Sequence, residues 1–474
     1  MRFIYFISIL LFSFSGCAQT KKINSVNQTS VNEAVAFPGA EGFGKFTTGG
    51  RGGKVVIVSN LNDNGEGSLR DAVNNHKPKI VVFAVSGTIH LLSPLSIKSN
   101  TTVAGQTAPG DGICLADYPV QLGGDNIIIR YMRFRMGDRY QNKGMVHGAG
   151  SDDAFSGMKR KNIIIDHCSM SWSTDEVLSV YGGDSTTLQW NLVAEPLNYS
   201  YHFETGDKDF QRHGYGGILG GRHMSIHHNL YAHCVSRTPR FDGNRNVKPD
   251  IELADFRNNV IYNWGGNNVY GGEGGQYNII GNYYKQGPNT NKSTQYRIAN
   301  PFKREPDLPF GKWHVANNYM EGSKDVTENN WKGVLMDKGT DADAETTKMK
   351  MPFDVMPVTT QSAQAAYDVI LQKVGASYKR DTLDERIIND VKNKTGKIID
   401  VQGGFPHGTA YEKTIGAWPA LKKGVVQNDL DKDGMPDEWE EKNGLNKNEA
   451  SDATTSKLHK HYTNIEVYIN SLVN

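Results

Sequence analysis

The chain has 474 residues, with 51 acidic and 52 basic side chains, so its formal net charge is close to zero. A dedicated nucleic-acid-binding protein usually carries a basic excess, and this balance argues against one. Hydrophobic residues make up 38% of the chain, which is enough for a large core and excludes disorder throughout. Glycine, at 51 residues, exceeds its usual share of ~7%, which indicates many turns rather than long helices.

The first sixteen residues are typical of an export signal. A basic residue precedes the apolar run Phe3–Phe14, which is too short to span a bilayer as a helix. Ser15-Gly16-Cys17 then resembles the cleavage site of bacterial lipoproteins, although Leu is usual where the apolar run ends in Phe. We therefore predict a signal peptide over 1–16 and a lipid anchor at Cys17, which would hold the exported protein on a bacterial envelope membrane. Ordinary cleavage further along, giving a secreted protein, is the alternative.

Residues 17–35 are polar and are predicted to form a linker from this anchor. Three cysteines follow in the rest of the chain: Cys114, Cys168 and Cys234. An odd number does not suit a disulfide framework, so we expect buried thiols.

The body, residues 36–325, repeats one short pattern. Apolar runs of strand length end in a similar polar position, and aligning these positions gives Tyr131, His167, Asn191, Asn229, Asn259, Asn282 and Asn318. The spacing has a floor of about 23 residues with insertions above it, which is typical of a solenoid. One strand per coil and no helix-length run between units predict an all-β parallel β-helix. A β-sandwich lacks such a register, and a propeller needs about four strands per 40 to 45 residues.

Asparagine recurs at the aligned corner for a physical reason. Its side chain tolerates a bent backbone, and its amide can bond to the same amide one coil away. We therefore expect stacked asparagines along the solenoid, with caps at its two ends.

Residues 326–425 form a different segment. The run 361–374 has helical spacing, with Ala363, Ala366, Val369 and Ile370 on one face and Gly375 as a stop signal. A second short helix is predicted over 384–392. We expect this partly helical extension to pack on the solenoid.

Acidic residues lie in two neighbouring units of the solenoid. Asp152 and Asp153 precede one strand, and Trp172–Glu176 contains Asp175 one unit later. If one coil separates these segments, Asp153 and Asp175 lie near each other on one outer face. Carboxylate oxygens brought together in this way bind Ca²⁺.

A basic and histidine-rich stretch comes two units later. His227 and His228 are adjacent on a strand and should face opposite sides, which favours buried histidines over a metal site. Arg237 and Arg240 lie three residues apart around a proline. Two such cations favour an anionic partner, and an acidic polymer would supply one.

Several motifs in this order resemble the pectate lyases of polysaccharide lyase family one. They are Phe37–Gly44, Gly105–Gly112, Ile165–Ser169, Ser171–Glu176, His213–Gly217 and Ser236–Arg240, and together they cover roughly 37 to 320. The resemblance implies a right-handed parallel β-helix that cleaves polygalacturonate by Ca²⁺-assisted β-elimination, giving 4,5-unsaturated products. It also implies an arginine base, which removes the proton next to the uronate carboxylate and falls here on Arg237.

The resemblance also assigns the remaining roles. Asp153 and Asp175 correspond to two calcium ligands, while the third carboxylate of the family is replaced by Ser179, so that Glu176 or Asp152 would take its place. Substrate would be bound by Arg212, by His213 next to it, and by Arg240, which would hold a galacturonate carboxylate. A further family arginine is replaced by Asp242, which indicates a different substrate clamp.

The C-terminal segment 426–474 contains the strongest local motif. Oxygen ligands at Asp429, Asp431, Asp433, Asp437 and Glu440, with the carbonyl of Met435 and a glycine at the sixth position, match the EF-hand calcium loop. This segment resembles the small calcium module at the C-terminus of many secreted bacterial carbohydrate enzymes. We expect a structural role for it.

Two rival functions use the same residues. A polygalacturonase-type hydrolase would use pairs of these aspartates as acid and base, but the Gly-His-Gly and Arg-Ile-Lys motifs of that family are absent. A non-catalytic pectin-binding surface protein remains open because of Ser179 and Asp242. For the lyase we expect a monomer with Ca²⁺ as cofactor, an acidic plant polysaccharide as partner, no nucleic acid, and membrane contact only through the lipid.

Overall fold

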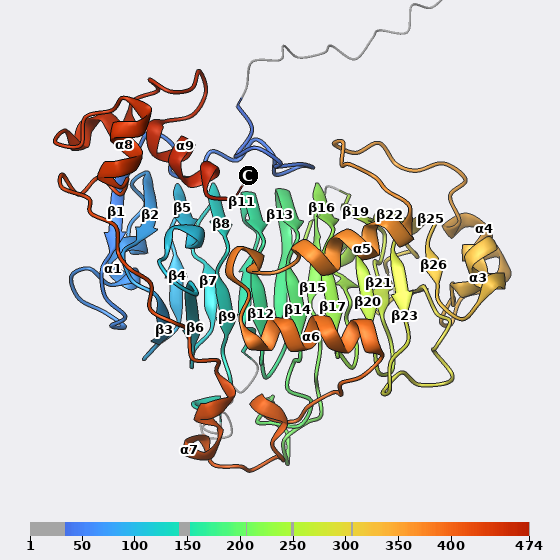
Figure 1. Cartoon of the computed structure of the whole chain (residues 1–474). Coiled ribbons are helices and arrows are strands. Elements are labelled where there is room, and N and C mark those ends of the chain that lie inside the picture. Colours follow the sequence, from blue (N-terminus) through green and yellow to red (C-terminus); the bar gives the residue numbers. More distant parts are fainter. Residues whose placement is uncertain (1–33, 142–151, 205, 248–250, 305–306, 474) are drawn as a thin grey trace, which may run out of the picture. The chain divides into compact units, whose positions relative to one another are not determined.

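The computed structural model describes residues 34–141, 152–204, 206–247, 251–304 and 307–473. The paired strands in this part of the chain run parallel, and each strand inside a sheet pairs with the strands one coil before and one coil after it (Figure 1). The predicted parallel β-helix is therefore confirmed. Its coils are built from three sheets, which we call sheets A, B and C.

Each sheet takes one strand from successive coils. Sheet A contains β1 (Lys54–Val58), β2 (Lys79–Phe83), β5 (Thr101–Ala104), β8 (Ile127–Arg130), β11 (Lys161–Asp166), the second half of β13 (Leu178–Gln189), β16 (Met224–His227), β19 (Leu253–Arg257), β22 (Gln276–Ile280) and β25 (Lys312–Ala316). Sheet B contains β3 (Gly87–His90), β6 (Ile113–Ala116), β9 (Arg133–Arg135), β12 (Ser169–Ser171), β14 (Leu192–Ala194), β17 (Leu230–Ala232), β20 (Val260–Tyr262), β23 (Tyr283–Lys285) and β26 (Tyr319–Met320). Sheet C contains β4 (Leu95–Ile97), β7 (Val120–Leu122), β10 (Phe155–Met158), the first half of β13, β15 (Ile218–Gly221), β18 (Arg240–Phe241), β21 (Val269–Gly271) and β24 (Ala299–Pro301).

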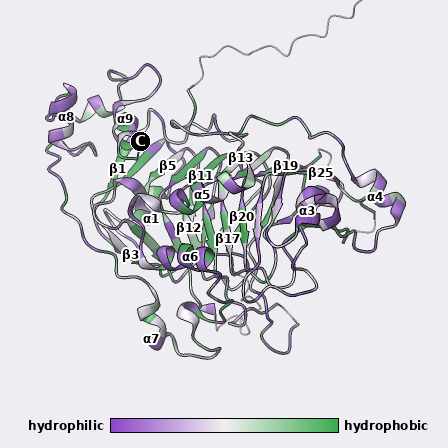
Figure 2. Ribbon diagram, turned by 45° about the vertical axis from the view of Figure 1, so that its right-hand side comes forward, coloured by the Kyte–Doolittle hydropathy of each residue, from purple (hydrophilic) through white to green (hydrophobic). Residues whose placement is uncertain are grey.

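The interior of the coils is filled by aliphatic and aromatic side chains. Figure 2 shows the hydrophobic residues concentrated in the strands. Stacked positions carry similar side chains, as in the isoleucine rows of β8 and β11 and in the ring contacts that join Phe241, Tyr277 and Trp313. Burial of these side chains in a continuous core is the main term that stabilises a solenoid.

The predicted asparagine stack is present at the corner between sheets A and B. The amide Nδ2 of Asn191 donates to Oδ1 of Asn229, and the same bond joins Asn229 to Asn259, at 3.1 and 3.0 Å. It continues through Asn282, Asn318 and Asn330 at 3.1, 2.9 and 3.1 Å. Each Oδ1 also accepts the backbone N–H of the previous asparagine, as at Asn191 with 2.8 Å. The stack therefore satisfies buried backbone and side-chain groups of five successive corners, and Asn330 of the 3-10 helix η4 (Asn330–Gly333) ends it.

The alignment of the first two corners was wrong by one residue. Four rings form one stack in the order Tyr131, His167, Trp190 and His228. The successive ring centroids are 4.8, 5.7 and 4.4 Å apart. These four residues have a positive φ and form the row directly before the asparagines. The register of β11 and β13 shows the shift. Asp166 pairs with Gln189, so His167 lies opposite Trp190, the residue before Asn191.

The turn at this row also changes the expectation for the two adjacent histidines. Because the chain bends at His228, His227 and His228 face each other, with their Nδ1 atoms 2.9 Å apart. Both are buried, and burial lowers the pKa of His227 well below its usual range and that of His228 to about 4. They are buried corner histidines, as expected, but they do not point to opposite sides.

The described cysteines are also as predicted. Cys114, Cys168 and Cys234 are free and buried, and burial raises the pKa of the Cys114 thiol to about 11.

Helices of the C-terminal extension cover the outer face of sheet B (Figure 1). The predicted helices are confirmed as α5 (Ala363–Lys373) and α6 (Thr382–Asn393). Ala366, Ile370 and Ile387 pack on Leu192, Leu230 and other residues of the sheet. Asp381 and Asp384 at the start of α6 bind the buried Arg135 of β9, which ties the helix to the sheet. The segment continues through α7 (Tyr411–Thr414), after which Trp418 joins the same cluster.

The C-terminal segment packs on the other side, against sheet A. It contains α8 (Asp437–Asn443), the 3-10 helix η8 (Ala450–Thr454) and α9 (Asn464–Ser471). Met435, Ile465 and Ile469 contact Ile80 and Val82 of β2.

Short helices lie at both ends of the coils. Leu69, Ala72 and Val73 of α1 (Leu69–Val73) join the core at the first coil, and α3 (Lys324–Glu328) and α4 (Asp341–Thr347) follow the last strands. In the described residues, no helix has the length and apolar character needed to cross a membrane.

Replacing Asn229 by alanine should lower the melting temperature by several degrees. The substitution removes the acceptor for Asn191 and leaves Oδ1 of Asn259 with fewer donors, which costs about 2–4 kcal/mol for buried polar groups. Asn62→Ala, at an exposed position, is the control and should change stability by less than about 0.5 kcal/mol. Equal melting temperatures for the two variants would contradict a stabilising role for the stack.

Candidate active site

Parallel stacking brings four segments into one row at the N-terminal ends of the strands of sheet C. The N–H of Asp175 donates to the carbonyl of Asp152, and the N–H of Ala154 donates to that of Glu176. Glu176 pairs with Tyr215, and Tyr215 pairs with Ser236, which directly precedes Arg237. Residues far apart in the sequence therefore occupy consecutive coils.

A pocket of about 370 Å³ opens at this row. It is lined by Pro94, Pro119, Gln121, Asp152, Asp153, Ser156, Asp175, Glu176, Ser179, Tyr181, Ile218 and Arg237. The predicted base and all the predicted carboxylates of the solenoid thus share one cavity.

The carboxylate of Asp175 lies close enough to that of Asp153 to oppose its ionisation. Burial, and then the charge of Asp175, hold the pKa of Asp153 well above its usual range, although a hydrogen bond from Ser179 opposes this. For Asp175 burial also raises the pKa, but the hydrogen bond and charge of His213 outweigh it, so the pKa is lowered. Two carboxylates that repel each other in a buried site are suited to bind a cation together.

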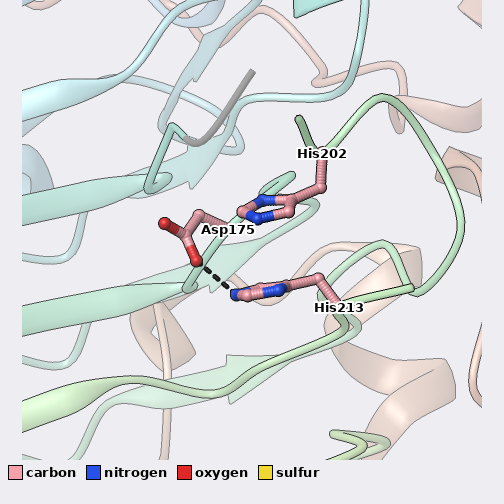
Figure 3. Close-up of side chains that lie close together, drawn as sticks. All are labelled: Asp175, His202 and His213. Carbon is pink, nitrogen blue, oxygen red and sulfur yellow. Dashed lines mark ion pairs between the residues drawn. The ribbon is translucent and has the colours of Figure 1, made fainter. Parts of the chain in front are cut away.

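Asp175 is held by a pair of stacked histidines. His213 Nε2 lies 2.5 Å from Asp175 Oδ1, and the ring of His202 stacks on that of His213 with centroids 3.8 Å apart (Figure 3). Both histidines are buried, and the ring of Tyr215 contacts the other side of His213. His213, predicted to touch substrate, therefore contacts a pocket carboxylate and does not line the pocket itself.

Arg237 is surrounded by three partners. Its Nη1 forms a close ion pair with Glu176 Oε1, and its Nε lies 3.3 Å from the hydroxyl of Tyr270. Its guanidinium carbon lies 4.4 Å from the ring centre of Tyr215. The side chain remains 21% exposed, so one side of it is open to the pocket.

Ser179 stands where the resemblance places the third calcium-binding carboxylate, so another side chain would have to join Asp153 and Asp175 as a ligand. Ser179 Oγ accepts the N–H of Ile218 at 3.2 Å and also bonds to Asp153. Of the two expected substitutes for the third carboxylate, Glu176 binds Arg237, while Asp152 Oδ2 accepts a hydrogen bond from Gln141 at 2.8 Å. Both line the pocket, so both remain candidates.

Two other predicted substrate contacts lie outside the pocket. Arg212 is exposed, stacks on Tyr199 at 4.4 Å and lies 3.9 Å from Asp400. Arg240 is buried and pairs with Glu273 at 3.1 Å. Burial, and then the charge of Arg245, lower the pKa of Arg240.

Asp242, which stands where the resemblance places an arginine, is also turned inward. It is buried and binds Arg245 at 2.6 Å and Asn246 at 3.0 Å.

The C-terminal loop forms a second acidic cluster. Oxygens of Asp429, Asp431 and Asp433 lie within 4.8 Å of one another, and Asp433 shares a similar group with Glu440. Burial is the main cause that raises the pKa of Asp433 to about 7 and that of Glu440 to about 8. Met435 is buried beneath the loop, whereas Asp437 is not part of either group.

Sequence reasoning missed the neutral residues around the base. Tyr215 and Tyr270 both contact Arg237, and Gln141 binds Asp152. Tyr215 lies within the recognised motif His213–Gly217, so its place in the row of the site could have been found from the coil spacing. Tyr270 carries no such signal. Cys17, the predicted lipidation site, lies outside the described residues.

No family model matches the chain. Curated relatives do: it is 36% identical over 453 residues to a protein of Aspergillus flavus named "Probable pectate lyase C", covering 93% of this chain and 94% of that protein. A protein of the same name from Aspergillus fumigatus is 35% identical over 464 residues, with 94% and 95% covered. "Probable pectate lyase 5" of Arabidopsis thaliana is 28% identical over 254 residues, with 44% and 60% covered.

Among solved structures, the chain is similar to "Pectate lyase bound to hexasaccharide", with a TM-score of 0.49, 14% identity, and 73% and 99% of the two chains covered. It is also similar to the cedar pollen allergen jun a 1, with a TM-score of 0.49, 15% identity, and 71% and 92% covered. The Aspergillus relatives match over nearly their whole length and over nearly all of this chain. On that similarity, the chain belongs to the pectate lyase family of enzymes.

Proposed function

We propose that the chain cleaves polygalacturonate by β-elimination, with Arg237 as the base and calcium as cofactor, and releases 4,5-unsaturated oligogalacturonides. The observation that carries the proposal is the shared pocket. Arg237 lies beside Glu176 in the cavity that Asp153 and Asp175 also line. A base next to a cation-binding carboxylate cluster is the arrangement that proton removal beside a uronate carboxylate needs.

The residues present fit a calcium ion. Asp153 and Asp175 supply hard oxygen ligands, and burial, followed by the charge of Asp175, raises the pKa of Asp153, two costs of ionisation that a cation would offset. Asp152 or Glu176 would complete the carboxylate set. When bound, calcium supplies positive charge that offsets the carboxylate of substrate and the negative charge that develops on it.

The chain's own groups prepare Arg237 for proton transfer. Tyr215 and Tyr270 hold the guanidinium from its face and its Nε edge, which fixes its direction into the pocket. Arg237 can accept the C5 proton only in its neutral form, so its ion pair with Glu176 must open first. The electrons of the broken C5–H bond form the new double bond, and the oxygen at C4 leaves.

His213 contributes through Asp175. It binds one oxygen of this carboxylate, and Tyr215 and His202 hold its ring on both sides. The other oxygen is thereby kept directed to the pocket, which is the role we assign to His213 in place of direct substrate contact.

Arg237→Ala should lower kcat by roughly 10²–10⁴-fold while polygalacturonate affinity changes little, because a general base contributes mainly to the chemical step. Formation of the unsaturated product and calorimetric binding would be measured together. Arg257→Ala is the matched control, since Arg257 also pairs with a carboxylate, Asp255, but lies on sheet A away from the pocket. Full turnover by Arg237→Ala would refute the base, and absence of turnover in the parent chain with intact binding would favour the binding-protein alternative.

The rate should rise with pH from neutral into the alkaline range. An arginine accepts a proton only after it has lost one, and the fraction in that form grows with pH. The calcium-ligand carboxylates should be ionised in the metal-bound enzyme throughout this range. The check is a kcat/KM profile at saturating Ca²⁺; a flat profile, or one that peaks in acid, would argue for a different base.

We further propose that the protein is exported as a lipoprotein, cleaved before Cys17 and held on a bacterial envelope membrane as a monomer. The support is the sequence of the first seventeen residues. Cys17→Ala should move the protein from the membrane fraction to the soluble exported fraction, because the residue that would carry the lipid is lost. Unchanged fractionation of this variant would favour ordinary secretion with cleavage further along.

The loop over 429–440 is proposed to bind calcium in a structural role. The support is its EF-hand spacing together with the clustered carboxylates.

A further inference from the structure

Carboxylates from two separate segments converge inside the C-terminal module. Oxygens of Asp433, Glu440 and Asp452 lie within 4.8 Å of one another, and Asp431 belongs to the group that shares Asp433. Glu440 is 0% exposed and Asp433 3% exposed. Yet both carboxylate oxygens of Glu440, one of Asp433 and one of Asp452 have no hydrogen-bond partner in the part of the chain that the structure describes.

Such an arrangement needs a cation. Buried ionised carboxylates without partners destabilise the fold, because they lose their hydration, and their mutual repulsion adds to this. Among the described residues, the basic side chain that forms an ion pair within the module, Lys447, binds Glu441 instead of this group. Several hard oxygen ligands at one point are the preferred environment of Ca²⁺.

Asp437, at the ninth position of the loop, has a different task. Its Oδ1 accepts the N–H of Leu430 at 2.8 Å, and its Oδ2 accepts a close hydrogen bond from the side chain of Asn428. Both oxygens thus tie the start of the loop to the first turn of α8. They are not directed to the cluster around Asp433 and Glu440.

Asp452 lies outside the loop, in η8, and contributes to the cluster the carboxylate that Asp437 does not. Its Oδ2 accepts the N–H of Asn446 at 3.0 Å, which leaves Oδ1 for the cluster. Its carbonyl accepts the side-chain amide of Asn464, the first residue of α9, at 2.9 Å. The carboxylate group and the start of α9 are therefore joined through one residue.

We propose that a calcium ion is held by Asp431, Asp433, Glu440 and Asp452, and that through Asp452 it acts as a latch that keeps α9 on sheet A. This rests on the structural calcium proposed for the loop but not on the lyase reaction. It takes Asp452 as a ligand in place of Asp437, and it leaves out Asp429, whose two side-chain oxygens accept the N–H groups of Asp433 and Gly434.

The contacts around the latch explain why it matters for the solenoid. Gly434 in the loop has a φ of 90°, and a methyl group there would lie 2.9 Å from Val82 and 3.0 Å from Val55. Ile465 of α9 packs in the same cluster, and Asn470 accepts a hydrogen bond from Arg130 of β8 at 3.1 Å. The ion would join the two halves of the module that together cover β1, β2 and β5.

The ligand set can be tested with terbium, which replaces calcium and is sensitised by a nearby tryptophan such as Trp439. The full chain would carry Asp153→Asn, so that the active-site pocket does not contribute. Asp452→Asn should weaken terbium binding by about tenfold or more. Because the N–H of Asn446 requires an acceptor, the asparagine carbonyl must face it and the NH₂ group must point into the cluster.

Asp437→Asn is the matched control. Its carbonyl can still accept from Leu430, and the amide of Asn428 can turn to present its oxygen. Terbium affinity should therefore change less than about threefold.

The latch has its own readout in hydrogen exchange. Calcium should slow exchange of the amides of α9 and β1 in the parent chain and in Asp437→Asn, but not in Asp452→Asn. Unchanged exchange in the parent chain on adding calcium would overturn the latch even if the ion binds.

The remaining outcomes are also decisive. A larger loss in Asp437→Asn than in Asp452→Asn, or equal losses, would overturn the ligand set in favour of the ordinary loop positions. No terbium binding by the Asp153→Asn chain would overturn both this proposal and the structural calcium, whereas the proposed lyase reaction, which uses a different site, would stand.

Discussion

The stacking of one coil on the next, in fixed register, is the constraint on which the rest of the structure depends. Parallel strands lie about 4.8 Å apart, so side chains at equal positions of neighbouring coils are forced into contact. At the corner between sheets A and B this distance suits one asparagine amide bonding to the next. At the start of sheet C the same distance places Asp152 and Asp175, or Glu176 and Tyr215, side by side.

This constraint concentrates like charges, and the molecule handles them in two ways. In the pocket of sheet C, the acidic residues have cationic or polar neighbours: Arg237 for Glu176 and His213 for Asp175. In the C-terminal module, Glu440 and Asp433 have oxygens with no hydrogen-bond partner among the described residues. The first arrangement places Arg237, the proposed base, next to carboxylates that we propose hold a metal ion. The second suits a permanently bound ion.

Much of the fold could be predicted from the sequence because its periodicity is local. The repeated corner gave the solenoid and its asparagine stack, and helical spacing gave α5 and α6. The error of one residue at Tyr131 and His167 arose because these coils carry aromatic rings in the preceding row and lack an asparagine to mark the corner.

The candidate site was harder to predict in detail. The place of Arg237, Asp153 and Asp175 in one pocket follows from coil spacing, and the motifs identified them. Arg212 and Arg240 belong to the same motifs, but the exposed loop and the buried pair with Glu273 keep them out of the pocket.

Asp452 lies outside the EF-hand spacing, and a carboxylate that tertiary packing brings to a cluster leaves no pattern in the sequence. The same limit applies to Tyr270, which reaches Arg237 from a later coil.

The most direct test of the central claim is the ultraviolet absorbance of polygalacturonate incubated with the purified chain, with Ca²⁺ and with a chelator. The account predicts an absorbance rise from the unsaturated product that the chelator abolishes. New reducing ends without that absorbance would mean hydrolysis and would contradict it.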